Sequence, residues 1–224
     1  ETEKAFQSYT KVLEDLMDQT GEEVDQLFTR TAIQYSKIST ARHDTGRVIA
    51  MLHEALVRAE ARDNLPAKAL LEVHLAKNEW LRARYDQAMA HFEKGWSLAK
   101  ELEDHQVTQS VTTFGTFFLF WQGRFKEAVD SYERSVHDVE HFPQAHFPLL
   151  GTITAGYCYA QIGQFNQSLG MLDAIRNHCL AKGDLYLAAY AVGNIGIVML
   201  ELRKVDESLS YMEQAVTLAT ESHN

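Results

Sequence analysis

Arg84-Tyr85-Asp86-Gln87-Ala88 is a short stretch that returns three times along the chain, each time forty residues further on. Its copies are Arg124-Phe125-Lys126-Glu127-Ala128, Gln164-Phe165-Asn166-Gln167-Ser168 and Lys204-Val205-Asp206-Glu207-Ser208. The small residue that ends each copy falls at positions 88, 128, 168 and 208, and Val48, one step earlier, ends a degenerate copy. A fixed period of this length is typical of a solenoid, whose stacked units together bury apolar faces that one unit cannot bury alone.

Each forty-residue unit has the pattern of two amphipathic helices. In one unit, Val111, Phe114 and Phe118 line one face at helical spacing, Gln122-Gly123-Arg124 breaks the run, and Phe125 begins the next. Only three prolines interrupt the chain, which suits long helices. The same alternation predicts an all-α chain with helices at residues 4–19, 22–41, 45–61, 65–83, 85–102, 105–122, 125–139, 145–162, 165–182, 184–202 and 205–222.

Local signals support these boundaries. Thr20 and Glu23 have the spacing of a capping box, in which the Thr20 hydroxyl accepts from a backbone amide of the first turn and Glu23 reaches back. Gly183 followed by Asp184 predicts the end of one helix and the start of the next. Pro66 falls in the first turn of its helix, where a missing amide hydrogen costs nothing.

Small residues recur on both helices of each unit and indicate close packing. On the second helix they allow a close approach to the first, and a larger residue one turn later fills the remaining gap. The small residues are Ala88, Ala128, Ser168 and Ser208, and the larger ones are Phe92, Tyr132, Leu172 and Met212. The facing small residues of the first helix are Ala76, Thr116, Gly156 and Gly196.

Small and aromatic residues at these offsets resemble the tetratricopeptide repeat, whose pattern is matched by Gly156, Tyr159, Gly163, Phe165, Ser168 and Leu172. The resemblance covers the chain as five two-helix units plus one preceding helix, and it implies a single right-handed superhelical domain over residues 1–224. The forty-residue period departs from the common one. Units of this length are similar to those of kinesin light chain, of the Leu-Gly-Asn spindle-orientation proteins and of MalT-like sensor regions, and the bacterial MalT-like group is favoured.

The composition excludes several classes of function. Hydrophobic residues make up 46% and charged residues 23%, as in ordinary globular proteins. The formal net charge of −10 argues against binding to nucleic acid, because an acidic chain repels phosphates. Apolar runs such as Phe117 to Trp121 are too short to cross a membrane, and no leader is recognisable. Cys158 and Cys179 lack metal-ligand spacing and predict buried free thiols in the cytoplasm.

The chain begins without a methionine, inside a helical pattern, and ends without an added polar helix. Solenoids need atypical terminal units for solubility. We therefore expect it to be a piece of a longer protein.

The resemblance implies that the first helix of each unit lines a concave groove. Trp80, Phe117, Phe120, Trp121 and Tyr157 are expected to form one aromatic strip across three units. Two interpretations remain open, because such aromatics can pack between helices or can receive a partner. The residues expected to bind in the groove are Val73, His74, Lys77, Trp80, Phe117, Phe120, Trp121, Ile153, Tyr157, Asn194 and Ile197.

Three of these residues are polar and are expected to fix the register of a ligand. At the position of Asn194, tetratricopeptide proteins often carry an asparagine that pairs with the backbone of a bound peptide, since an amide both donates and accepts. A role in helix packing is equally open for Asn194. His74 and Lys77 are expected to add polar contacts. The lysine and asparagine cluster that clamps acidic chaperone tails is absent, which disfavours such a partner.

Nothing in the sequence indicates catalysis. It has no glycine-rich phosphate loop, no Gly-x-Ser-x-Gly elbow and no His-Glu-x-x-His motif. His137 and His141 are one helical turn apart and His146 follows, but a zinc site needs further ligands at fixed geometry. We therefore expect no enzyme activity, no metal and no cofactor.

The sequence predicts a scaffold module that binds a peptide or protein segment in its groove, within a larger bacterial regulatory or signalling protein. The alternative is a domain of a MalT-like ATP-dependent transcription regulator, in which the aromatic strip senses a small-molecule effector such as a sugar. Self-association through the uncapped ends of the solenoid is a third possibility.

Overall fold

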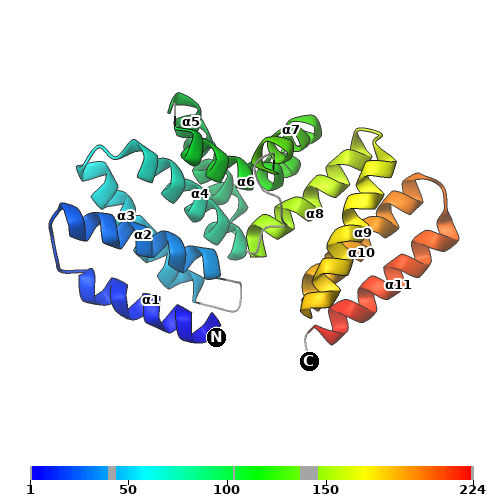
Figure 1. Cartoon of the computed structure of the whole chain (residues 1–224), viewed down its shortest axis with the longest axis horizontal. Coiled ribbons are helices and arrows are strands. Elements are labelled where there is room, and N and C mark those ends of the chain that lie inside the picture. Colours follow the sequence, from blue (N-terminus) through cyan, green and yellow to red (C-terminus); the bar gives the residue numbers. More distant parts are fainter. Residues whose placement is uncertain (1, 40–43, 103, 137–145, 223–224) are drawn as a thin grey trace. The chain divides into compact units, whose positions relative to one another are not determined.

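The computed structural model describes residues 2–39, 44–102, 104–136 and 146–222, and these residues form helices joined by turns (Figure 1). The predicted helices match the observed bounds to within three residues at each end. The all-α prediction is confirmed for the described residues. The helices are α1 (Thr2–Leu16), α2 (Glu22–Ile38), α3 (Thr45–Ala61), α4 (Leu65–Leu81), α5 (Tyr85–Glu101), α6 (His105–Trp121), α7 (Phe125–Val136), α8 (His146–Gln161), α9 (Phe165–Lys182), α10 (Leu185–Glu201) and α11 (Val205–Glu221).

The helices belong to two compact units. The first unit holds α1 to α5 and α6 up to Phe114, and the second holds α6 from Gly115, α7, α8 from Leu149, and α9 to α11. The first helix of each repeat is α2, α4, α6, α8 or α10, and the second is α3, α5, α7, α9 or α11. Helix α3 packs on its own first helix, α2, and also on the first helix of the next repeat, α4, and α9 likewise packs on α10. That residues 1–224 form a single domain stays a prediction.

The turn inside a repeat has the same backbone shape after α4, α6, α8 and α10. Its middle residue is left-handed, with φ of 57° at Ala83, 71° at Gly123, 81° at Gly163 and 62° at Arg203. The next amide donates to the carbonyl five residues back, as Arg84 does to Glu79. Glycine adopts this conformation freely, whereas a side chain makes it costly. The repeat geometry is therefore kept at Ala83 and Arg203 against their local preference.

Helix ends confirm some of the predicted caps and contradict one. Gly183 ends α9 with a left-handed φ of 72°, and the Asp184 side chain accepts from the Leu187 amide at 3.0 Å, as predicted. The capping box at Thr20 is wrong. Helix α2 begins at Glu22 with Gly21 as its N-cap, and no side chain caps it. Thr20 therefore lies one residue outside the position from which its hydroxyl could reach the first-turn amides.

The small residues bring the two helices of a repeat into direct contact, as the sequence predicts. A Cβ built on Gly156 of α8 would lie 2.6 Å from Leu172 Cδ2 of α9, and one on Gly196 of α10 would lie 3.1 Å from Met212 Cε of α11. Ser208 Oγ donates to the Gly196 carbonyl at 2.8 Å. The glycines therefore leave room for the larger side chain of the second helix, and a methyl group at Gly156 would collide with it.

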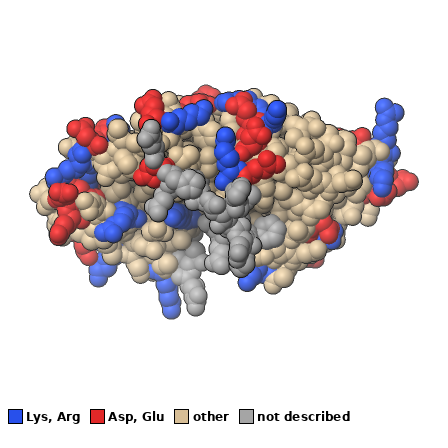
Figure 2. Space-filling view, turned by 45° about the horizontal axis from the view of Figure 1, so that its top comes forward, with Lys and Arg blue, Asp and Glu red and all other residues tan. Residues whose placement is uncertain are grey.

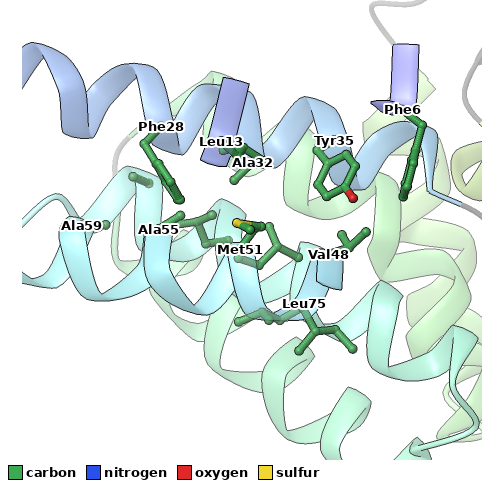
Figure 3. Packing of buried hydrophobic residues seen from close by; sticks show 14 residues of the cluster. Phe6, Leu13, Phe28, Ala32, Tyr35, Val48, Met51, Ala55, Ala59 and Leu75 are labelled. Atoms are coloured by element: carbon green, nitrogen blue, oxygen red, sulfur yellow. The ribbon is translucent and has the colours of Figure 1, made fainter. Parts of the chain in front are cut away.

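The first unit has a continuous apolar core between α1, α2, α3 and α4 (Figure 3). Phe6 and Tyr35 pack with their ring centroids 4.5 Å apart, and the Tyr35 hydroxyl is paired with Thr10 Oγ1. Leu52 of α3 and Leu75 of α4 are fully buried in the same core. The preceding helix α1 is thus part of this core, through Phe6 and Leu13.

The two cysteines are free and buried, as predicted. Burial raises the pKa of Cys158 to about 12 and that of Cys179 to about 11, so both are held as thiols. In the described part of the chain, no helix combines the length and the apolar character needed to span a membrane.

Candidate functional site

The first helices of the second unit carry almost no charge. Glu201 is the only aspartate, glutamate, lysine or arginine in the sequences of α6, α8 and α10. The second helices α7, α9 and α11 carry charged residues of both signs or of negative sign. Figure 2 shows one face of the molecule, where a broad area has no charged side chain beside clusters that have many. A surface built from first helices is therefore suited to an uncharged ligand.

Four aromatic residues of the second unit form a cluster that reaches the surface. The ring centroid of Phe120 lies 5.3 Å from that of Trp121, 6.1 Å from Phe125 and 5.5 Å from Tyr157. Trp121 is 55% exposed, and the other three are half-buried. We call Phe120, Trp121, Phe125 and Tyr157 the aromatic cluster. Neighbouring rings hold Trp121 from one side and leave much of its surface open to a ligand.

Two further exposed tyrosines lie on α10, and neither was among the predicted groove residues. Tyr186 and Tyr190 are exposed, their rings lie 5.1 Å apart, and the Asn194 amide donates to the Tyr190 carbonyl at 2.9 Å. Spacings of four residues place all three on one face of the helix, and Ile197 falls on the same face. We call Tyr186, Tyr190 and Asn194 the tyrosine face. The sequence could have indicated this face, because steps of four residues back from Asn194 lead to Tyr190 and Tyr186.

The faces of α8 and α10 are joined by a hydrogen bond. Gln161 Nε2 donates to Glu201 Oε1 at 2.5 Å. Trp121, Gln161 and Glu201 occupy the same position in three successive repeats, since they are forty residues apart. This repeat position therefore carries an indole on α6, an amide on α8 and a carboxylate on α10.

Five predicted groove residues are buried, so their assignment as ligand contacts is wrong. Ile153 and Phe117 are almost fully covered, and Phe117 packs on Phe118 with centroids 5.4 Å apart. Val73 is also buried, and a Cβ on Gly95 would lie 2.9 Å from Val73 Cγ1, so α5 covers it. The other two are His74 and Lys77. Counting along a helix does not give the depth at which each residue lies.

Lys77 is 1% exposed and closes the C-terminal end of α2 instead of facing a groove. Its Nζ donates to the carbonyls of Ser36 at 2.5 Å and Ser39 at 2.9 Å. His74 Nδ1 lies 2.9 Å from Ser36 Oγ, and Asn78 Nδ2 donates to the same oxygen at 2.8 Å. The last carbonyls of a helix lack the usual partner within it, and here Lys77 supplies a donor to the Ser39 carbonyl and adds one to the Ser36 carbonyl, which also accepts from Ser39.

Arg58 makes a similar contact one helix earlier. Its guanidinium donates to the carbonyls of Met17 at 2.6 Å and Gln19 at 3.2 Å, just beyond the end of α1. It also lies over the ring of Phe28, 4.2 Å from the centroid. Both buried cations thus come from a later helix and cap an earlier one.

The burial of Lys77 gives a testable dependence of stability on pH. Burial lowers its pKa to about 7 in the folded chain, whereas an unfolded lysine titrates at about 10.4. Between these values the unfolded chain binds more protons, so the free energy of unfolding rises by about 2 kcal/mol from pH 7 to pH 8.5. The free energy of unfolding is measured by urea denaturation at each pH for the wild type and for Lys77→Met. The difference between the two is expected to show this rise. A difference that stays constant with pH would contradict it.

The remaining predicted residues keep some exposed surface. Trp80 is half-buried in the first unit and packs on the exposed Tyr85, with centroids 4.6 Å apart. Phe120, Trp121, Tyr157, Asn194 and Ile197 belong to the second unit. Their role as ligand contacts stays a prediction. His137 and His141, and the side chain of His146, lie outside the described residues.

The chain has the tetratricopeptide-type helical repeat fold that its forty-residue period predicts. Among solved structures, it is similar to BtubC (BKLC) from P. vanneervenii, with a TM-score of 0.65 and 12% identity, over 100% of this chain and 92% of that one. It is also similar to the nearly identical TPR-like repeats of a putative kinesin light chain from Podosopora anserina. Two structures of that protein have TM-scores of 0.54 and 0.51 and identities of 13% and 12%.

These two matches cover 91% and 88% of this chain and 99% and 95% of those chains. No protein-family model and no curated protein matches the sequence. The likenesses concern the fold alone, and the resemblance to MalT-like sensors stays a prediction.

Proposed function

We propose that this chain is a non-catalytic binding module that holds a peptide or protein segment on the first-helix surface of its second unit. The observation that carries the proposal is the exposure of Trp121 on α6, within an aromatic cluster whose neighbours Phe120 and Tyr157 also lie on first helices that have almost no charge. Large aromatic side chains that keep open surface are favoured at the centres of protein interfaces. The tyrosine face offers two further exposed rings on α10.

The chemistry of this surface favours a ligand segment with apolar or aromatic side chains and few charges. Charged ligand groups would find few partners on α6, α8 and α10, where Glu201 is the only charged residue. The Asn194 and Gln161 amides can pair with a peptide backbone, since each side chain both donates and accepts. Helices that hold these groups in place lose little entropy when the ligand binds.

The test selects peptides from a random phage-displayed library on the wild-type chain and then titrates them against variants. Trp121→Ala and Tyr190→Ala are each expected to weaken binding about 30-fold, the effect of a hot-spot loss of about 2 kcal/mol. Leu180→Ala is the matched control, because Leu180 is an exposed apolar residue on the second helix α9. It is expected to leave the affinity unchanged.

The proposal is wrong if the selected peptides bind both aromatic variants as tightly as the wild type. Nuclear magnetic resonance adds an independent measurement, since the Trp121 indole and the Asn194 amide signals are expected to shift on binding. Circular dichroism of each variant confirms that a loss of binding is not a loss of fold.

A further inference from the structure

Two histidines from different repeats meet in the first unit. His53 of α3 is exposed, His91 of α5 is half-buried, and their ring centroids lie 5.8 Å apart. We call His53 and His91 the histidine pair. Both residues lie on second helices of the first unit, so the pair is separate from the surface assigned to the proposed function, which lies on first helices of the second unit.

A buried carboxylate fixes the ring of His91. Glu72 of α4 is 5% exposed, and its Oε2 lies 2.5 Å from His91 Nδ1. Gly95 allows the close approach of α5 to α4, since a Cβ built on it would lie 2.9 Å from the Ala69 carbonyl oxygen. An ionised Glu72 can only accept, so this contact places the ring proton of His91 on Nδ1 and leaves a lone pair on Nε2.

The arrangement around His91 is the usual one for a histidine that binds a metal ion. Such a histidine donates one ring N–H to a carboxylate, which orients the ring and makes the other nitrogen a better ligand. Two imidazoles that share one tetrahedral zinc ion have their ring centroids roughly 5 Å apart. The centroids of the histidine pair are 5.8 Å apart, and His53 is exposed, so a small side-chain rotation would close the difference.

We propose that the histidine pair binds a divalent transition-metal ion of the zinc class through His91 Nε2 and one ring nitrogen of His53. Imidazole is a preferred ligand of such ions. Glu72 is a positioning residue, because it contacts His91 and not the ion. In the described part of the chain, no three histidine, cysteine, aspartate or glutamate side chains are grouped to hold a metal ion, so water completes the coordination shell. The bound ion joins α3 to α5.

The test titrates zinc chloride into the whole chain and follows the histidine ring signals by nuclear magnetic resonance. The signals of His53 and His91 are expected to shift together, with one affinity. His53→Ala and His91→Gln are each expected to weaken this binding by at least the roughly 10–100-fold that the loss of an orienting group alone costs. The amide introduced by His91→Gln can still donate to Glu72, so the buried carboxylate keeps a partner.

Glu72→Gln tests the positioning role separately. Zinc is expected to shift both histidine signals in this variant, but at a concentration about tenfold higher, while circular dichroism shows an unchanged fold. His178→Ala is the matched control, because it removes a histidine from α9 in the second unit, and it is expected to leave the affinity unchanged. The proposal is overturned if zinc shifts neither signal of the pair, or if His53→Ala or Glu72→Gln binds zinc as tightly as His178→Ala does.

Discussion

Replacing Lys77 by alanine is expected to lower the free energy of unfolding by about 3–5 kcal/mol at pH 8.5. The substitution removes donors from the buried carbonyls of Ser36 and Ser39 and leaves a cavity where the lysine chain lay. The Ser36 carbonyl keeps the Ser39 amide and hydroxyl as donors, so the expected loss comes from the Ser39 carbonyl and from the unfilled cavity. Urea denaturation followed by circular dichroism gives the value.

Lys94→Ala is the control for this prediction, because Lys94 is exposed on α5. Its effect is expected to stay within about 0.5 kcal/mol, as for most surface substitutions. Hydrogen exchange identifies the destabilised region. The backbone amides of the last turn of α2 are expected to lose protection first. An effect of Lys77→Ala no larger than that of Lys94→Ala would show that the buried contacts contribute nothing.

Gly156→Val is the second substitution with a large expected effect, a loss of about 3 kcal/mol. The added carbons would enter the space of the fully buried Leu172, whose Cγ lies 2.7 Å from a Cβ built on Gly156. Overpacking at the contact between α8 and α9 would force the two helices apart or push Leu172 from its rotamer. Thermal denaturation of the variant measures the loss.

Gly170→Val provides a close control for it, because Gly170 is also a helix-interior glycine but has no atom within 4 Å of a built Cβ. It is expected to be neutral or slightly stabilising, since valine has a higher helix propensity than glycine. Leu172→Ala in the Gly156→Val background is expected to recover part of the loss. Additive effects of these two substitutions would contradict the steric explanation.

The period predicted the helices well because it fixes many positions at once. Gly156, Gly196 and Ser208 were identified as contact residues from their forty-residue spacing, and the structure has them in contact. The failure at Thr20 has a local cause. A capping box depends on a helix boundary to a single residue, and α2 starts one residue later than that motif requires.

The candidate site was harder to predict, because residues at the same repeat position are not buried to the same extent. Lys77, Phe117, Tyr157 and Ile197 share one repeat position, yet the first two are buried and the last two are half-buried. What covers Lys77 is the C-terminal turn of α2, a contact that depends on how neighbouring helices end. Tyr186 and Tyr190 were missed because only the later half of their helix was counted as groove-facing.

The hydrogen bonds of Arg58 and Lys77 to the ends of earlier helices also affect how the first unit unfolds. In a simple array, a terminal helix can fray while the rest stays folded. Here the end of α1 is bonded to Arg58 of α3, and the end of α2 to Lys77 of α4. Opening α1 or α2 alone would strand a buried positive charge or a buried amine. The first four helices should therefore open together, as one cooperative block instead of a series of independent steps.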